Sequence, residues 1–370
     1  MSEITTASNV DAGRSPRTEP ELPLLTLEAS SPITSLATAH PSYLAAGSED
    51  GTVRIYAPPQ PKVVKAIRRL GGEVSSLVFC TKGKQDGRPP STLWVVCENS
   101  ALCFNLESDS LILDKGGAMV NLRLLEPSTE DDVVNKLAIN PAQTHLAYSC
   151  DSGIVGIVEL KSKSNTRMKA GHANVCDTLS FIPDRPRELV SGGYDKALLH
   201  FDYLQGVKLS QFDLTDVPAS NDEDPQSNVS LSPPLCHALA VSPAGIIAAA
   251  TASGHLWVGL GGKKGGKKKA RKWEGLKPDE AKSFKIAEGP VVAVAFRAPE
   301  AVLTVTLSGS LALHTLNSSD DYSLQKVWST ATKKVVKANA VASGGDTGWV
   351  AVGGAGSANK GYVEVWTGPG

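Results

Sequence analysis

Apolar and polar positions alternate along short segments of this chain, and the segments recur at regular spacing. Each unit reads as an alternating strand, a turn, a strand of small and apolar residues, a tight turn and a third alternating strand. Four units show this order clearly: residues 33–56, 134–160, 236–260 and 292–316. Three more fit less closely: residues 74–106, 175–203 and 336–367. The chain therefore contains seven copies of a three-stranded unit, spaced by roughly 45–50 residues.

A spacing of this size is typical of β-propeller blades, in which a fourth, outer strand completes each sheet. Residues 62–70 (KVVKAIRRL) can supply one such outer strand. Residues 21–29 precede the first unit without a partner, while the last unit has no fourth strand. Pairing these two closes the ring and removes exposed strand edges. We therefore predict an all-β, seven-bladed β-propeller closed by strand 21–29. The near absence of helical periodicity disfavours an α/β enzyme.

Two insertions and the first twenty residues interrupt the repeating pattern. Residues 213–234 are acidic and rich in Ser and Pro, and residues 261–282 begin with a basic run. Both predict flexible surface loops, and residues 1–20 predict a disordered tail ahead of a single propeller domain at residues 21–370. The formal net charge is −1. No overall field therefore attracts nucleic acid or a membrane, and any such attraction would be local.

The cysteines and histidines form no pattern that is typical of a metal or redox site. The six cysteines include no C-x-x-C pair and mostly lie in apolar runs, where a free cysteine behaves as a small buried hydrophobe. The histidines are dispersed, so we expect no metal and no cofactor. The N-terminus lacks the apolar region of a signal peptide, and the longest apolar run is too short to span a bilayer. We expect an intracellular monomer, cytoplasmic or nuclear or both, that does not bind membranes.

The stretch 171–203 contains the residue types of a hydrolase. His172, Ser191 and Asp195 together suggest a nucleophile with its base. However, Ser191 lies in a predicted strand and lacks the G-x-S-x-G turn that exposes a nucleophile. The units also show no acidic residue repeated at equivalent positions, as a hydrolase built around a propeller channel would need. We therefore interpret these residues as structural and expect no enzyme activity.

The basic run in the second insertion supports three readings. It contains Lys263, Lys264, Lys267, Lys268, Lys269, Arg271 and Lys272 without an acidic residue. Its spacing imitates a phosphate-binding loop, but Lys268 stands where Ser or Thr must bind Mg²⁺. A solvated loop is the simplest interpretation. A nuclear import signal or a contact with RNA or DNA phosphates, with Trp273 stacking on a base, are the alternatives.

Several segments resemble WD40 repeats, and these identify the units more closely. They are AAGSEDGTVRIY, GHANVC and VSGGYDKALLHFD. Beyond these, the order of segments from about residue 30 to about residue 367 is similar to one narrower group of this family. The resemblance implies a WD40-type propeller. It also implies that His172, Ser191, Asp195 and Phe201 form a hydrogen-bonded chain within one blade, although Phe201 stands where Trp is usual and lacks the indole donor.

The same resemblance implies a non-enzymatic interaction scaffold. The narrower group is suspected of acting as substrate receptors of cullin-4 type ubiquitin ligases, through the propeller adaptor of the ligase. Such receptors often carry a W-D-x-R motif at the end of a blade. The nearest segments here are FDYL and VWTG, and neither has the arginine. We expect protein partners on the top face and rim of the propeller. A nuclear or RNA-associated propeller that uses the basic loop is the alternative.

Overall fold

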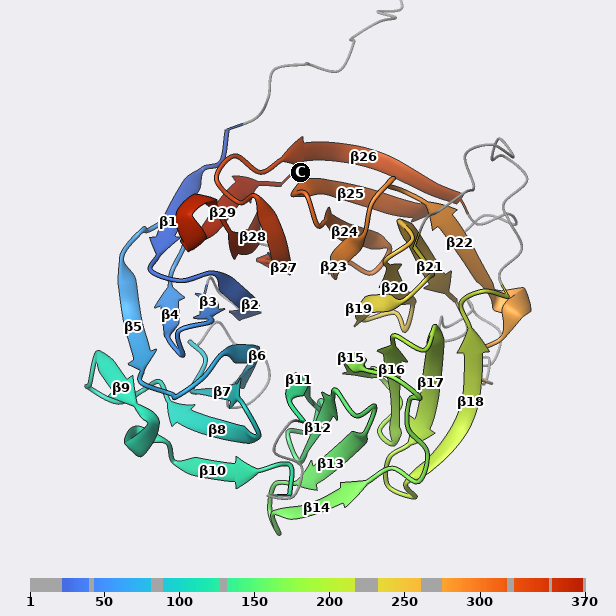
Figure 1. Cartoon of the computed structure of the whole chain (residues 1–370), viewed down its shortest axis with the longest axis horizontal. Coiled ribbons are helices and arrows are strands. Elements are labelled where there is room, and N and C mark those ends of the chain that lie inside the picture. Colours follow the sequence, from blue (N-terminus) through green and yellow to red (C-terminus); the bar gives the residue numbers. More distant parts are fainter. Residues whose placement is uncertain are drawn as a thin grey trace, which may run out of the picture.

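The computed structural model describes residues 22–39, 43–80, 89–126, 132–216, 232–260, 275–317, 323–345 and 348–368. Seven sheets surround a central axis, as Figure 1 shows, and their strands are antiparallel except where β9 (Ile112–Asp114) joins the first blade. The prediction of an all-β, seven-bladed propeller is therefore confirmed. The described residues contain no α-helix and three short 3-10 helices, which are η1 (Lys115–Gly117), η2 (Pro278–Glu280) and η4 (Ser357–Asn359).

Each blade is built on four strands, and the first of them lies nearest the central axis while the fourth lies at the rim. Blade 1 comprises β2 (Ile33–Ala39), β3 (Tyr43–Ser48), β4 (Val53–Tyr56) and β5 (Val63–Arg68). Blade 2 comprises β6 (Val74–Cys80), β7 (Thr92–Cys97), β8 (Ser100–Asn105) and β10 (Val120–Arg123). Blade 3 comprises β11 (Val134–Ile139), β12 (His145–Cys150), β13 (Val155–Glu159) and β14 (Ser164–Arg167). Blade 4 comprises β15 (Cys176–Phe181), β16 (Glu188–Gly193), β17 (Ala197–Asp202) and β18 (Val207–Asp213).

The remaining three blades repeat this order. Blade 5 comprises β19 (Cys236–Val241), β20 (Ile247–Thr251), β21 (His255–Gly259) and β22 (Ala281–Lys285). Blade 6 comprises β23 (Val291–Ala298), β24 (Ala301–Thr306), β25 (Ser310–Asn317) and β26 (Ser323–Ala331). Blade 7 comprises β27 (Lys337–Ser343), β28 (Trp349–Ala355), β29 (Gly361–Thr367) and β1 (Leu25–Ala29).

The second strand of each blade explains the runs of small and apolar residues in the sequence. Every residue of β20, IAAAT, is buried, because neighbouring blades cover both faces of the strand. A strand that is buried on both faces reads as a continuous apolar run, not as an alternation. The core is therefore a series of layers between blades. In the layer between blades 3 and 4, for example, Ile157 packs in one cluster with Leu189 and Phe201.

Glycine is required in the tight turn between the second and third strands of several blades. Gly153 adopts a φ of +80°, and a Cβ atom there would lie 2.2 Å from the His172 carbonyl oxygen. Gly254 adopts a φ of +82°, and its Cβ would lie 2.0 Å from the Ala287 oxygen. Only glycine adopts this backbone without strain. The turn also lies against the incoming loop of the next blade, which leaves no room for a side chain.

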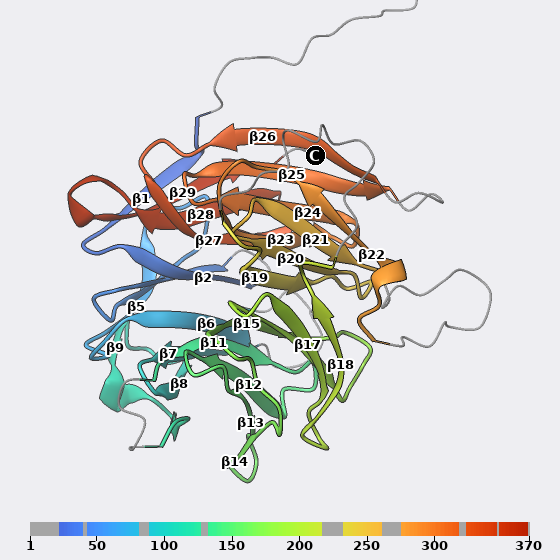
Figure 2. The ribbon, with the colours of Figure 1, turned by 45° about the vertical axis from the view of Figure 1, so that its right-hand side comes forward.

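The ring closes through the first strand of the chain. β1 pairs antiparallel with β29, in a register that places Leu25 opposite Val365 and Ala29 opposite Gly361. Figures 1 and 2 show the two strands side by side although they come from opposite ends of the sequence. The strand begins at Leu25, whereas the sequence pattern predicted a start at residue 21, which lies outside the described residues.

Blade 1 carries a fifth strand that the sequence pattern did not predict. Between β8 and β10 the chain leaves blade 2 and adds β9 (Ile112–Asp114) parallel to β5. Lys65 anchors this excursion, because its ammonium group donates to the Ser108 carbonyl at 2.7 Å and contacts the Ser108 hydroxyl at 3.0 Å. A three-residue strand is too short to produce an alternation that sequence reading can detect.

The two predicted insertions are shorter than the sequence suggested. Residue Asp213 belongs to β18, and residues Ala281 and Lys282 begin β22. The predicted boundaries were wrong there because charged and small residues in short outer strands resemble loop composition. Residues 217–231 and 261–274, and the tail at 1–20, lie outside the described residues.

All six cysteines are free and buried. Burial raises the pKa of the thiols of Cys80, Cys103 and Cys150 to about 11. Because the thiolate is the reactive form, we expect fewer than one of the six thiols to react with Ellman's reagent at pH 8 in the folded protein. All six should react in guanidinium chloride. Rapid reaction of one or more thiols in the folded protein would contradict this packing.

Candidate functional site: the top face of blades 3 to 5

We call the face that carries the turns between second and third strands, and the connections between blades, the top face. Backbone hydrogen bonds hold these two sets of segments together. The His172 N–H donates to the Gly153 carbonyl at 2.9 Å, and the Ala338 N–H donates to Leu307 at 2.9 Å. Loops on a rigid sheet scaffold are where binding residues are usually placed. The polar side chains of this face are therefore the first candidates for function.

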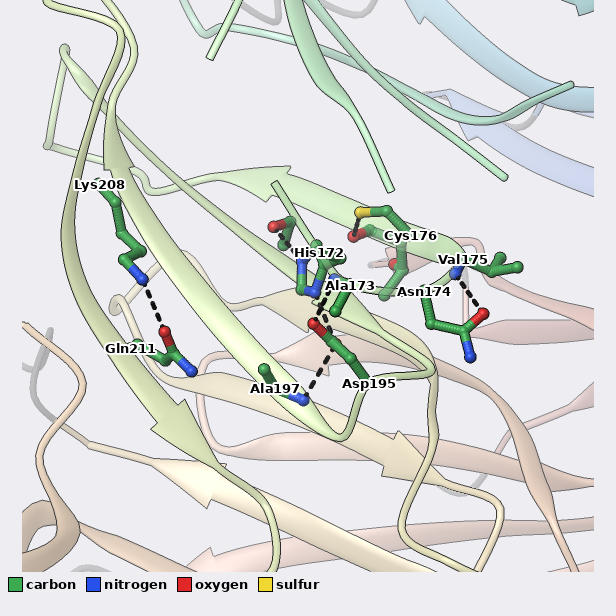
Figure 3. A network of polar contacts seen from close by, with 11 residues as sticks. His172, Ala173, Asn174, Val175, Cys176, Asp195, Ala197, Lys208 and Gln211 are labelled. Carbon is green, nitrogen blue, oxygen red and sulfur yellow. Dashed lines mark hydrogen bonds and ion pairs between the residues drawn. The ribbon is translucent and has the colours of Figure 1, made fainter. Parts of the chain in front are cut away.

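A hydrogen-bonded chain of three side chains lies in blade 4 at this face (Figure 3). His172 Nδ1 is 2.8 Å from Asp195 Oδ1, and His172 Nε2 is 2.8 Å from Ser191 Oγ. Asp195 also accepts from the Ala173 N–H at 2.9 Å and from the Ala197 N–H at 3.3 Å. The chain thus links the loop before β15 to the turn between β16 and β17.

Electrostatics fix the direction of these hydrogen bonds. Burial alone would raise the pKa of Asp195, but the hydrogen bonds from His172 and Ala173 outweigh it and hold the pKa below its usual value. The ionised carboxylate of Asp195 accepts a hydrogen bond from His172 Nδ1–H. When the imidazole is neutral, His172 Nε2 is then an acceptor, and Ser191 donates to it.

This order of contacts is also that of a Ser–His–Asp catalytic triad. The difference lies in access, because Ser191 is 0% exposed and His172 is 6% exposed. No substrate carbonyl can reach a hydroxyl that lies inside the blade. Phe201 is likewise 0% exposed and packs in the layer between blades 3 and 4 without offering a donor. The geometry therefore fits a device that holds two segments of one blade together.

The other candidates from the sequence have different outcomes. The basic residues 263–272 lie outside the described residues. Within the described ranges, no group of three His, Cys, Asp or Glu side chains is arranged to hold a metal ion. No helix in the described part of the chain is long and apolar enough to cross a membrane.

Each first strand carries a β-bulge at the same position, near its top end. The bulged residues are Thr34, Ser75, Asn135, Asp177, His237, Val292 and Asn339. A bulge turns its residue out of the ladder and re-aims the side chain. The seven positions therefore form a ring around the mouth of the central channel, one from each blade.

Four of the seven side chains join adjacent blades in the same way. Each donates to the carbonyl of the residue that precedes the bulge in the next blade. The donor–acceptor pairs are Thr34 to Val74 at 2.7 Å, Ser75 to Val134 at 2.6 Å, Asn135 to Cys176 at 3.2 Å and Asn339 to Ile33 at 2.8 Å. These bonds from the bulged residues join blade 7 to blade 1 and blades 1 to 4 in sequence.

This series of bonds stops at blade 4. Asp177 occupies the bulge there, and an ionised carboxylate has no proton to donate. Val292 in blade 6 has no polar group at all. Places where a repeated structural rule is broken are expected at functional sites. The junction between blades 4 and 5 is therefore the second candidate site, and we call it the channel mouth, defined by Lys136, Asp177, Tyr194 and His237.

The side chains at the channel mouth contact one another. The Tyr194 hydroxyl donates to Asp177 Oδ2 at 3.1 Å and lies 3.1 Å from His237 Nδ1. The rings of Tyr194 and His237 meet edge to face with centroids 5.2 Å apart. Asp177 and His237 lie 3.7 Å apart, with 30% and 22% of their side chains exposed. Unlike the His172 chain, this group is open to solvent.

The local field at the channel mouth is negative. Burial raises the pKa of Tyr194, and the carboxylates of Asp177 and Asp151 raise it further. Asp151 is itself held by the Asn135 side-chain amide at 2.9 Å. Lys136 is the nearby cation; crowding by protein lowers the pKa of its ammonium group, and Asp177 partly opposes that shift. Two carboxylates thus act on Tyr194, and Lys136 interacts with one of them, Asp177.

Comparison with known proteins agrees with this architecture. A family model described as "WD domain, G-beta repeat" matches residues 22–57. One unit of this seven-bladed propeller is thus similar to a WD40 repeat. The matched unit contains β1 to β4, so the sequence repeat begins with the outer strand of blade 7 and ends with the third strand of blade 1. In the matched unit the sequence repeat and the blade are therefore offset by one strand.

The propeller is also similar to a curated protein of Dictyostelium discoideum, named "WD repeat-containing protein 53 homolog". The two are 27% identical over 169 residues, which is 45% of this chain and 42% of that protein. The chain therefore aligns with less than half of that relative's length. This similarity agrees with the likeness of residues 22–57 to a WD40 repeat.

The sequence analysis did not predict the channel mouth. His237 was counted among the dispersed histidines, and Asp177 was not singled out. A signal was present, because both residues occupy the bulge position, where four other blades have Thr, Ser or Asn and blade 6 has Val292. Aligning the seven units on that position would have shown the exceptions.

Proposed function

We propose that the chain is a non-enzymatic scaffold that binds partner proteins on its top face and rim. The observation that carries this proposal is the contrast between the two polar groups of the top face. The His172 chain is closed to solvent and used for packing, whereas the side chains of Asp177 and His237 at the channel mouth are partly exposed. A rigid ring with an accessible polar group at its mouth is suited to recognition, and Ser191 is not accessible as a nucleophile.

A more specific proposal is that the chain acts as a substrate receptor of a cullin-4 type ubiquitin ligase. The family resemblance supports it, and so does one contact. The FDYL segment lacks the arginine of the W-D-x-R motif, but Arg187 from the loop before β16 lies 2.8 Å from Asp202. An arginine thus accompanies this aspartate from elsewhere in the blade. Leu204, 54% exposed, follows in the same turn.

Affinity purification of the full chain from cells tests both levels of this proposal. We expect stable co-purification of protein partners, including cullin-4 and its propeller adaptor. Leu204→Asp places a charge at the exposed turn and should reduce recovery of the adaptor by about tenfold. Leu209→Asp is the matched control, because Leu209 is 50% exposed on the outer strand of the same blade.

The outcomes distinguish the general scaffold function from the ligase-receptor role. Recovery of no protein above background would rule out the scaffold. Recovery of other partners without ligase subunits, or equal adaptor recovery with both variants, would remove only the receptor role. The alternative, a nuclear or RNA-associated propeller, depends on residues 263–272, and it remains a prediction from sequence.

A further inference from the structure

We propose that the channel mouth receives a positively charged side chain, an arginine or lysine, of a protein partner. This inference rests on the proposed scaffold function and names the chemistry that one of its surfaces recognises. It is based on the broken series of inter-blade bonds, on the free acceptor capacity of Asp177 and on the charge balance around Tyr194.

The first argument is the arrangement of donors and acceptors. At four junctions the bulged side chain donates to the neighbouring blade, so its polar group is used within the ring. At the junction of blades 4 and 5 Asp177 brings an acceptor instead of a donor. A donor for the Asp177 carboxylate must therefore come from a residue other than the seven bulged ones. Tyr194 supplies one such donor, to Oδ2 of Asp177.

The second argument is what remains of the Asp177 carboxylate. Tyr194 and His237 both contact Oδ2, and within the described residues Oδ1 receives no hydrogen bond. A carboxylate offers about four acceptor positions. With 30% of the side chain exposed, Oδ1 is available to an incoming ammonium or guanidinium group. Charge-assisted bonds of this kind are about twice as strong as neutral ones.

The third argument is charge complementarity. Asp177 and Asp151 flank Tyr194, and Lys136 compensates one of these two charges. Within the described residues Lys136 forms no ion pair with either carboxylate. A cation from a partner restores the balance, whereas an acidic group would meet two carboxylates. Lys136 competes for the same acceptors, so its charge should weaken the binding of a basic side chain.

The test uses degenerate, capped peptide libraries that carry a single fixed central residue. The fixed residue is arginine, lysine, citrulline or norleucine, and binding to the immobilised full chain is measured by fluorescence. We expect the arginine and lysine libraries to be retained about tenfold more than the citrulline library, because a charge-assisted bond to Asp177 contributes on this scale.

Two variants should change the binding of the arginine and lysine libraries in opposite directions. Asp177→Asn keeps the shape of the side chain and should remove the preference for arginine and lysine. Lys136→Met removes the competing cation and should strengthen binding of both basic libraries severalfold. Asp279→Asn is the control, because Asp279 is an exposed carboxylate in η2 at the outer part of blade 5. Thermal unfolding checks that each variant is folded.

Equal retention of the arginine and citrulline libraries would overturn the proposal, as would a preference that survives Asp177→Asn. Weaker binding after Lys136→Met would also contradict it. If partner proteins still co-purify with the chain while these results are negative, the scaffold function stands and only the cation site fails.

Discussion

Replacing Glu364 by glutamine should lower the unfolding temperature of the protein by about 4 °C. Glu364 lies in β29 and is 0% exposed, yet its carboxylate receives backbone N–H groups from the loop between β26 and β27. Oε1 accepts from Lys333 at 3.0 Å, from Lys334 at a shorter distance and from Val335 at 2.9 Å. A buried carboxylate therefore organises the connection from blade 6 to blade 7.

Glutamine has nearly the same shape, but it is neutral and presents one amide group to donors that need acceptors. Losing charge-assisted bonds at a buried site costs about 3 kcal/mol. Glu28→Gln is the matched control, since Glu28 lies on β1 in the same sheet and forms an exposed ion pair with Lys360. Exposed pairs contribute little, so the control should shift the transition by about 1 °C or less. Equal shifts for both variants, measured by calorimetry, would show that Glu364 has no special role.

Asp195→Ala should destabilise the protein by about 2 kcal/mol at pH 7, the second largest effect that we expect. The substitution removes the acceptor for His172 Nδ1 and for the Ala173 and Ala197 N–H groups. Asp213→Ala is the control, because Asp213 lies at the end of β18 in the same blade and its side chain accepts local hydrogen bonds from Thr215, two residues away. Urea unfolding monitored by tryptophan fluorescence gives both values.

The effect of Asp195 should also depend on pH in a defined direction. Its pKa in the folded protein lies below the usual aspartate value, so the stabilisation is fully present above the pKa of the unfolded chain. It is lost as the pH falls through the lower, folded value. The difference in free energy of unfolding between the native protein and Asp195→Ala should therefore be constant at neutral pH and shrink below about pH 4. A difference that grows on acidification would contradict the assigned protonation.

The blade pattern could be read from the sequence because it is local. Each unit carries its own alternation and its own tight turn, and a strand such as residues 247–251 shows its two-sided burial in its composition. The positions of His172 and Asp195 could also be read, because the resemblance to WD40 repeats fixes them within one unit.

The remaining features depend on contacts between distant segments. In GYVEVWT the position of Glu364 reads as a solvent-facing residue of an alternating strand, and nothing nearby shows that three N–H groups converge on it. Asp177 reads as an ordinary polar residue until the other bulge positions are seen to donate across blades. β9 leaves its own blade to pair with β5, and three residues carry no period.

The pairing of β1 with β29 has a consequence for how the protein is made. Residue 25 leaves the ribosome long before its partner, residue 365, is synthesised. At about 5–20 residues per second, this interval lasts roughly 20–70 s. During that time β1 lacks its partner strand, and blades 1 to 6 can assemble while the ring remains open. The last blade is completed only after β29 has been made, and a chain truncated even shortly before β29 is left with an exposed sheet edge.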